Sequence, residues 1–249
     1  MDQTAESKEA RIYLENGYKE VNGWLGANIP KALDCCVTIM KQHDHKWEHS
    51  LEIGVHEGKF FIPIERVTPD DKEAVAIDVF DIQMFNIDKS GLGNLQRFMA
   101  NISKYCRLPG RVVVEKEDSF NMRMTHLNDR NYSLISVDGG HTVQHVMFDM
   151  EFAAERLQPG GIIILDDFPN NSWLGVLEGI TLYFHRQSAR VAPFAVGYNK
   201  LFITTVSYQK IYFEEIRKNI QNFGLDEGRI TQFCGWPIQA LAQRHFRPI

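Results

Sequence analysis

Short apolar runs alternate with longer amphipathic stretches along most of this chain of 249 residues. The runs are rich in valine, isoleucine or leucine and lie at residues 49–55, 74–80, 111–117, 132–138 and 160–168. The stretches between them are long enough for the crossover helices that parallel strands require. Nearly continuous apolar strands are typical of a sheet covered on both faces. The pattern therefore predicts an α/β fold with a doubly wound, mostly parallel sheet.

Helical periodicity precedes and follows these strands. Apolar spacing predicts helices over about residues 5–21 and 31–42, which form an N-terminal helical cap. Another helix is expected over 172–187, and then two strands joined by a Gly-Tyr-Asn turn at 192–206. We expect this C-terminal antiparallel hairpin at the edge of the sheet.

Three segments follow from this organisation. Residues 1–46 are the predicted cap, 47–206 the ligand-binding domain, and 207–249 a C-terminal extension with helical parts but no clear assignment. In the helix after the fourth strand, Thr142 is the expected N-cap, and "QPGG" is expected to stop the helix before the fifth strand.

Composition excludes several classes of partner. The chain has 27 basic and 32 acidic residues and a net charge of −5, so it has no general attraction for nucleic acid or an anionic membrane. It begins without an apolar signal region and has no apolar run of spanning length. We therefore expect a soluble, cytoplasmic protein that acts on a small-molecule acceptor, with a homo-oligomer left open. The four cysteines lack zinc-site spacing and are expected to be free, buried thiols.

The first two strand ends carry a pattern that suits a nucleotide-like cofactor. Glu52, Gly54 and Gly58 form an E-x-G-x-x-x-G pattern, in which glycine permits a tight turn and close backbone approach. Asp78 ends the second strand, where a carboxylate can accept both hydroxyls of a ribose. The loop lacks the second glycine that brings backbone against a pyrophosphate. The pattern therefore favours an adenosine-bearing cofactor without a diphosphate.

On these residues, the chain resembles the class I S-adenosylmethionine-dependent methyltransferases, which have a Rossmann-like fold. "EIGVHEG" is similar to the first motif of that family, "AIDVF" to its ribose-binding strand end, and "EKEDSF" to its adenine contact. The resemblance implies S-adenosylmethionine as the cofactor. The residues that it assigns to the cofactor are Glu52, Gly54 and Gly58 at the methionine portion, Asp78 at the ribose, Asp118 and Ser119 at the adenine, and in addition Asp138.

Three carboxylates follow two neighbouring strands of the predicted sheet. Asp138 ends the fourth run, and Asp166 and Asp167 come near the end of the fifth. Because adjacent strands lie about 4.8 Å apart, these side chains can converge on one cation, and oxygen ligands select Mg²⁺, Mn²⁺ or Ca²⁺ over zinc. Successive side chains of a strand point to opposite faces, so Asp166 and Asp167 can both reach one metal only if the chain leaves strand geometry there. The alternative is that these aspartates cap turns.

His141 follows Asp138 in the turn before the next helix. An unperturbed imidazole has a pKa of about 6.5 and can accept a proton at neutral pH, and a divalent ion lowers the pKa of a hydroxyl bound to it. We therefore predict that His141 is the base. The alternative is a helix-terminal residue hydrogen-bonded to a carboxylate, and His145 is expected at the surface or behind the site.

The combination of "VDGGH", "PGGIIILDDF" and "YNKLF" is similar to one branch of the family, which contains the macrocin and mycinamicin sugar O-methyltransferases and the cephalosporin hydroxylase-like proteins. That resemblance implies that Asp138, Asp166 and Asp167 bind Mg²⁺ or Mn²⁺ and that His141 acts as base. It implies an O-methyltransferase acting on a hydroxyl of a small molecule, with a sugar or a glycosylated natural product favoured.

Two other functions stay open. Asp138, His141 and His145 could form a two-histidine iron site, which would make the protein a metal-dependent hydroxylase or oxidoreductase. The predicted adenosine pocket argues against that function. The other open function is that of a non-catalytic cofactor-binding protein.

Two further features concern the acceptor. Phe168 and Trp173 are expected to pack the next helix rather than line an acceptor pocket, and residues 81–92 are a candidate substrate loop.

Overall fold

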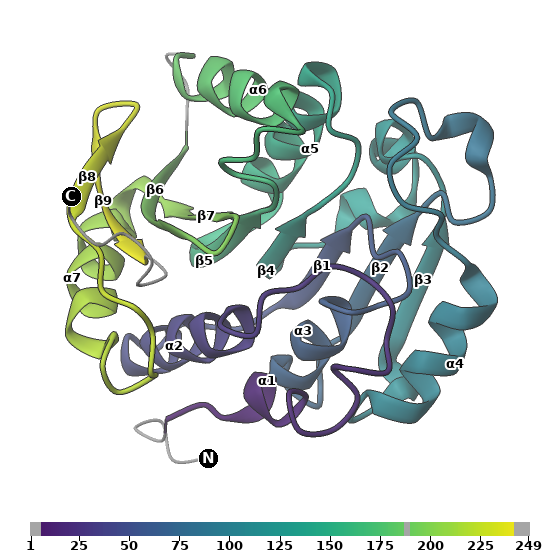
Figure 1. Cartoon of the computed structure of the whole chain (residues 1–249), viewed down its shortest axis with the longest axis horizontal. Helices are drawn as coiled ribbons and strands as arrows, with labels where there is room; N and C mark the ends of the chain where they lie inside the picture. Colours follow the sequence, from purple (N-terminus) through teal and green to yellow (C-terminus); the bar gives the residue numbers. More distant parts are fainter. Residues whose placement is uncertain (1–5, 187–189, 242–249) are drawn as a thin grey trace.

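A nine-stranded sheet lies at the centre of the computed structural model, which describes residues 6–186 and 190–241 (Figure 1). The strand order is β3-β2-β1-β4-β5-β7-β6-β9-β8. The first five strands in this order are mutually parallel: β1 (His49–Ile53), β2 (Ala74–Asp78), β3 (Val112–Lys116), β4 (Tyr132–Val137) and β5 (Leu157–Leu165). The predicted doubly wound, mostly parallel α/β sheet is confirmed. Because the strand order reverses between β1 and β4, a ligand crevice is expected at their carboxyl ends.

An antiparallel extension continues the sheet beyond β5. The predicted hairpin of β6 (Val191–Gly197) and β7 (Lys200–Thr205) is confirmed, with β7 paired to β5. Its predicted place at the sheet edge is wrong, because β9 (Trp236–Leu241) pairs in parallel with β6 and β8 (Ile230–Phe233) lies outside β9. This second hairpin satisfies the backbone groups that β6 would otherwise leave unpaired.

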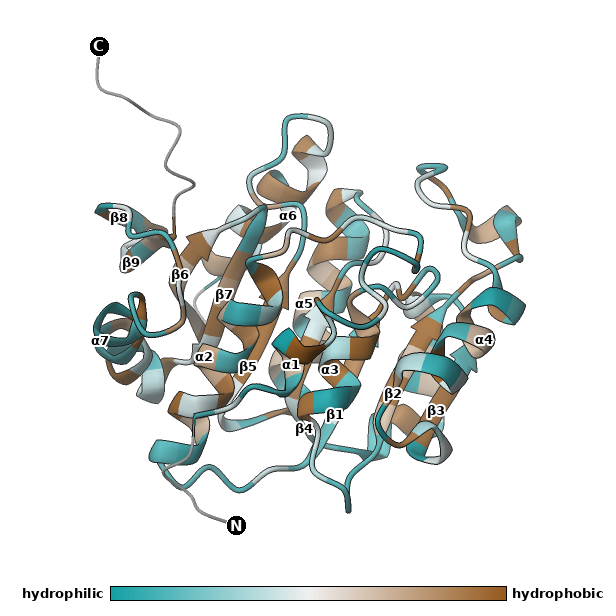
Figure 2. Ribbon diagram, turned by 60° about the horizontal axis from the view of Figure 1, so that its bottom comes forward, coloured by the Kyte–Doolittle hydropathy of each residue, from teal (hydrophilic) through white to brown (hydrophobic). Residues whose placement is uncertain are grey.

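Helices cover both faces of the sheet (Figure 1). On one face lie α5 (Val143–Arg156) and α6 (Leu174–Phe184), and Thr142 caps α5 as predicted by accepting the N–H of His145 at 3.3 Å. The helices on the opposite face are α2 (Ile29–Gln42), α3 (Phe61–Val67), α4 (Leu95–Tyr105) and α7 (Gln209–Asn219). Apolar residues concentrate in the strands and the inward helix faces, so the core forms two layers around the sheet (Figure 2).

The N-terminal segment is less helical than its apolar spacing predicts. Of the helix expected over 5–21, whose first residue lies outside the described residues, the structure forms α1 (Glu9–Ile12), followed by turns. Gly17 lies among these turns with a φ of +112°, which a helix cannot contain, and a β-carbon there would lie 2.6 Å from the Tyr105 ring. The second predicted helix is confirmed as α2, with Pro30 in its first turn.

The "QPGG" segment, predicted to separate a helix from a strand, lies inside β5. Tyr132 pairs with Leu157, and the register shifts before Leu134 pairs with Ile162. Gly160 lies in this irregular part with a φ of +78°, which explains why a turn-like sequence can occur within the strand.

The chain ends with elements of the same sheet. Residues 207–241 of the predicted C-terminal extension contribute α7, β8 and β9, whereas residues 242–249 lie outside the described residues, as does Gln187 of the helix predicted over 172–187. No helix in the described part of the chain is long and apolar enough to cross a bilayer. The four cysteines are free, and Cys35 and Cys36 are buried, whereas Cys106 and Cys234 are partly exposed.

Candidate active site

A cavity of about 1160 Å³ opens at the carboxyl ends of β1, β2, β4 and β5. Its wall contains every residue that the sequence analysis assigned to cofactor, metal or base, except Gly58. Gly58 has a φ of +92°, and a β-carbon there would lie 3.2 Å from the ring of Phe98. This glycine therefore lets the turn after β1 pack against α4 instead of facing the cavity.

The turn after β1 brings two strand ends into close contact. A β-carbon on Gly54 would lie 1.8 Å from the carbonyl oxygen of Asp138, and the φ of Gly54 is +83°. Glu52 is buried two residues earlier in β1, where its Oε1 accepts the hydroxyl of Ser136 at 3.1 Å. Burial raises the pKa of Glu52 to about 8. Its Oε2 is buried and has no hydrogen-bond partner within the described ranges.

The end of β2 and the turn after β3 form the next part of the wall. Asp78 Oδ2 accepts the backbone N–H of His56 at 2.8 Å, and Oδ1 accepts that of Phe80. Burial raises the pKa of Asp78, although these hydrogen bonds oppose the shift. Asp118 Oδ1 accepts the backbone N–H of Phe120 at 3.0 Å and caps the 3₁₀ helix Ser119–Met124. Each carboxylate retains lone pairs toward the cavity.

The acidic strand ends lie side by side and contact a buried lysine. The N–H of Asp138 donates to Ile53 at 2.8 Å, and Nζ of Lys200, from β7, donates to Asp166 Oδ2 at 2.7 Å. Burial and the neighbouring charge of Asp166 raise the pKa of Asp138. Burial alone would lower the pKa of Lys200, but Asp166 and Asp138 outweigh it and raise that pKa. Lys200 therefore offsets part of the negative charge; it lies in the "YNKLF" motif, for which the sequence had given no role to the lysine.

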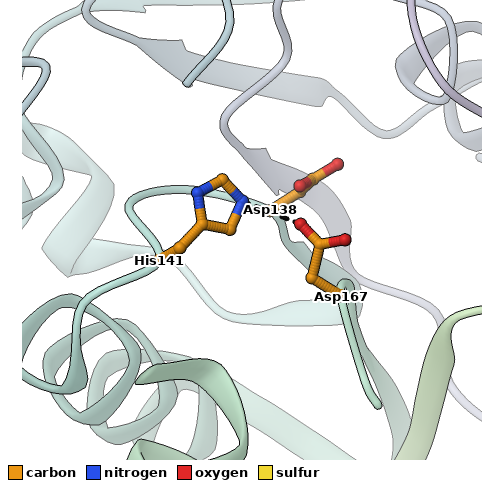
Figure 3. A group of neighbouring side chains, drawn as sticks. All are labelled: Asp138, His141 and Asp167. Atoms are coloured by element: carbon orange, nitrogen blue, oxygen red, sulfur yellow. Dashed lines mark ion pairs between the residues drawn. The ribbon is translucent and has the colours of Figure 1, made fainter. Parts of the chain in front are cut away.

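Asp138, His141 and Asp167 form a cluster in which one ligand atom from each residue lies within 4.8 Å of the others (Figure 3). Asp167 leaves strand geometry with a φ of +55°, so its side chain turns toward His141 while that of Asp166 turns toward Lys200. The sequence analysis grouped Asp166 with the other two aspartates. The structure instead gathers His141 with Asp138 and Asp167.

Asp167 is held by two amides. Its Oδ1 accepts hydrogen bonds from Asn170 at 2.6 Å and from Asn199 at 2.7 Å, and its Oδ2 lies 2.8 Å from Nε2 of His141. Burial alone would raise the pKa of Asp167, but the hydrogen bonds from His141 and the amides lower it. The Asp167 carboxylate is therefore an oriented anion at the edge of the cluster.

The ring of His141 is fixed on three sides. Its Nδ1 lies 2.8 Å from Asp88 Oδ2, its Nε2 faces Asp167, and its plane stacks on Trp173 with centroids 4.2 Å apart at 15°. Burial alone would lower the pKa of His141, but Asp167 and Asp88 outweigh it and raise that pKa. Burial likewise opposes ionisation of Asp88, yet hydrogen bonds from Ser90 and His141 lower its pKa to about 2. The sequence analysis had marked the segment of Asp88 as a candidate substrate loop, and it expected Trp173 to pack a helix.

His145 is not part of the cluster. It is 6 % exposed, its ring stacks on Phe120 with centroids 4.3 Å apart, and its Nδ1 lies 2.8 Å from Thr142 Oγ1. The expectation of a surface position is therefore wrong, and a two-histidine site with Asp138 does not form in the part of the chain that the structure describes. Phe168 is buried and packs against Phe233 at 4.8 Å, as expected for a packing residue.

Comparison with known proteins gives one family and a set of structural relatives. Residues 51–168 match the model of a family described as a methyltransferase domain. None of the curated proteins compared with the chain matches it.

Solved O-methyltransferase structures superpose on most of this chain. NovP superposes with a TM-score of 0.58 at 14% identity, covering 71% of this chain and 80% of NovP. TomG from Streptomyces achromogenes, in complex with SAM, gives 0.56 at 14% identity, covering 80% and 90%. The O-methyltransferase from Bacillus cereus, in complex with SAH, gives 0.54 at 17% identity, covering 80% and 91%. At these identities the similarity establishes a shared fold.

Proposed function

We propose that this chain, whose residues 51–168 match a methyltransferase domain, is a class I S-adenosylmethionine-dependent enzyme. In this proposal it transfers a methyl group to a hydroxyl of a small molecule and depends on a divalent metal. The observation that carries this proposal is the cluster of Asp138, His141 and Asp167 in the wall of the cofactor cavity. It puts cation ligands and a base within reach of one acceptor oxygen.

The cavity fits S-adenosylmethionine. The buried Oε2 of Glu52 has no protein partner within the described residues, and an ammonium group of the cofactor would satisfy it. Asp78 would accept the ribose hydroxyls, and Asp118 with Ser119 would contact the adenine. When bound, the cofactor supplies an electrophilic methyl group on a sulfonium sulfur. The turn at Gly54 leaves room for close approach because it carries no side chain.

Asp138 and Asp167 would hold the metal. Their carboxylate oxygens suit Mg²⁺ or Mn²⁺ better than zinc. A bound cation lowers the pKa of a hydroxyl that it contacts. Asp166 is paired with Lys200 at 2.7 Å, so it would contribute to the metal site mainly through its charge.

His141 would accept the proton of the acceptor. Its Nε2 faces the cluster, whereas its Nδ1 is bound to Asp88. As the acceptor oxygen attacks, the hydroxyl proton would pass to Nε2. The fixed ring plane supports this role, because a base must lie within hydrogen-bond reach of the proton.

The acceptor that we favour is a sugar or a glycosylated natural product. The cavity wall combines the aromatic rings of Trp24 and Trp173 with the amides of Asn170 and Asn199. Aromatic faces stack on the C–H face of a sugar ring, and amides bind its hydroxyls. Vicinal hydroxyls would in addition chelate the metal.

Methyl transfer to a panel of sugar nucleotides and glycosides tests the proposal. EDTA should abolish transfer, and Mg²⁺ or Mn²⁺ should restore it, because the acidic cluster would then be neutralised by its cation. His141→Ala should lower kcat by about 10²- to 10⁴-fold. The affinity for S-adenosylmethionine, measured by calorimetry, should change little in this variant.

His126→Ala is the matched control, because His126 is half-exposed, pairs with Glu115 and does not line the cavity. Transfer that is indifferent to the chelator would refute the metal dependence. Equal losses of turnover and cofactor affinity in His141→Ala would make His141 structural. Binding of NADH in place of S-adenosylmethionine would favour an oxidoreductase, and tight cofactor binding without transfer to any acceptor would favour a non-catalytic protein.

A further inference from the structure

The segment between β2 and α4, residues 81–93, turns one acidic side chain inward while most of its bulky apolar side chains face solvent. Met84 and Ile87 are 82% and 65% exposed, whereas the side chain of Asp88 is 12% exposed. Asp88 reaches a residue 53 positions further along the chain, His141. A carboxylate that is shielded from solvent needs a hydrogen-bond donor, and His141 is that donor for Asp88.

Both oxygens of Asp88 have defined partners. Oδ2 accepts the backbone N–H of His141 at 2.7 Å and lies 2.8 Å from the ring Nδ1 of the same residue. Oδ1 accepts the backbone N–H of Ser90 at 2.9 Å and the Ser90 hydroxyl at 2.6 Å. Ser90 therefore holds the carboxylate in one orientation, and a single oxygen binds the main chain and the ring of His141 together.

We propose that Asp88 is a positioning residue that sets the ring orientation of His141. A carboxylate oxygen accepts hydrogen bonds, so Nδ1 of the ring donates to Asp88, and Nε2 lies on the opposite edge of the ring. Nε2 is the nitrogen that faces the Asp138 and Asp167 side of the cluster. The stacked ring of Trp173 fixes the plane of the His141 ring. This inference rests on the proposed function, in which His141 is the base.

Two substitutions separate orientation from charge. Asp88→Ala removes the acceptor and should lower kcat by about 10- to 100-fold, with KM for S-adenosylmethionine within about twofold of wild type. Asp88→Asn should recover only part of the rate. Its amide oxygen can accept the backbone N–H and the ring Nδ1–H of His141, but its NH₂ group then faces the backbone N–H of Ser90, so the side chain is held less firmly.

A spectroscopic measurement tests the same point without an acceptor. In ¹⁵N-histidine-labelled protein, the ring of His141, assigned by its absence in His141→Ala, should show a hydrogen-bonded Nδ1–H in wild type. In Asp88→Ala this Nδ1–H signal should shift or be lost to exchange with solvent. A His141 signal that is the same in wild type and Asp88→Ala would overturn the proposal, even if the protein methylates nothing in the panel.

Asp81→Ala is the matched control, because Asp81 is an exposed acid of the same segment that pairs with Lys116. It should leave kcat and the His141 signal unchanged. In a His141→Ala background, Asp88→Ala should cause no further loss of more than about twofold, because its effect runs through that ring. A full, independent loss in this background, or a parallel loss of melting temperature and cofactor affinity, would make Asp88 a structural residue.

Discussion

Contacts of single atoms determine the shape of the turns around the cavity. A β-carbon on Gly139 would lie 2.9 Å from Oδ2 of Asp149, a residue of α5 that is 1% exposed. Neither carboxylate oxygen of Asp149 has a hydrogen-bond partner within the described residues. Burial raises the pKa of Asp149 to about 7. The fold therefore favours the protonated form of this carboxyl near neutral pH.

The free energy of unfolding of the Asp149→Asn variant should increase relative to that of the wild type as the pH rises. The folded-state pKa of about 7 lies above the unfolded value of about 3.9, so folding takes up a proton and the wild type loses stability from about pH 4 up to pH 7. Between pH 5 and pH 8 the free energy of unfolding of the variant should gain about 2–3 kcal/mol relative to wild type. Urea denaturation at both pH values measures the difference.

The exposed residue Asp129 provides the comparison for this prediction. Asp129→Asn should shift the free energy of unfolding by similar amounts at pH 5 and pH 8. If the Asp149→Asn difference is also independent of pH, the carboxyl of Asp149 does not titrate with folding.

At the scale of elements, the hairpin of β8 and β9, which are the last described strands of the chain, extends to the cavity. β9 pairs with β6, and Leu241 at its end lines the cavity. A β-carbon on Gly197 would lie 2.1 Å from the carbonyl oxygen of Leu241, so the two strands approach closely only because residue 197 is glycine. The end of β9 is therefore part of the cavity wall.

Gly197→Ala should detach the end of β9 from β6. Backbone atoms cannot move aside as a flexible side chain can, so the contact with Leu241 must open. Hydrogen exchange of residues 236–241 should accelerate by about 10-fold or more, while exchange in β1 and β4 stays slow. Gly110→Ala, where a β-carbon meets nothing within 4 Å, should leave exchange unchanged. Unaltered protection of β9 in Gly197→Ala would contradict a tight β6–β9 contact.

At the scale of the whole molecule, one cavity links residues from the N-terminal segment to the last described strand. Trp24, His141 and Leu241 all contribute to its wall. A ligand that fills this cavity contacts both the parallel and the antiparallel parts of the sheet. Ligand binding should therefore stabilise the fold as a unit.

S-adenosylhomocysteine should raise the melting temperature. At about 100 times its dissociation constant, a ligand adds about 2.7 kcal/mol, which for a chain of this size corresponds to roughly 5–10 °C. Differential scanning fluorimetry measures the shift. Asp78→Ala, which removes the expected ribose acceptor, should abolish most of the shift whatever its own melting temperature. A wild-type protein with no shift at saturating ligand would contradict the cofactor assignment.

The local pattern of apolar and polar residues was sufficient to predict the main strands, the acidic strand ends and the glycine turn after β1. Periodicity reports which face of a strand is buried, and strand ends place Asp78, Asp138 and Asp167 at one edge of a parallel sheet. The hairpin of β6 and β7 was visible for the same reason. These features depend on residues close together in the chain.

Only the tertiary structure determined which side chains meet at that edge. Asp88 contacts His141 across 53 residues, Lys200 pairs with Asp166, and Trp173 both packs against the core, as predicted, and stacks on His141. The partner of each group is selected by how separate loops and strands pack, which local periodicity does not encode. The sequence by itself thus determined the sheet, its topology class and the acidic edge, and packing decided the orientation of the His141 ring and the pairing of charges.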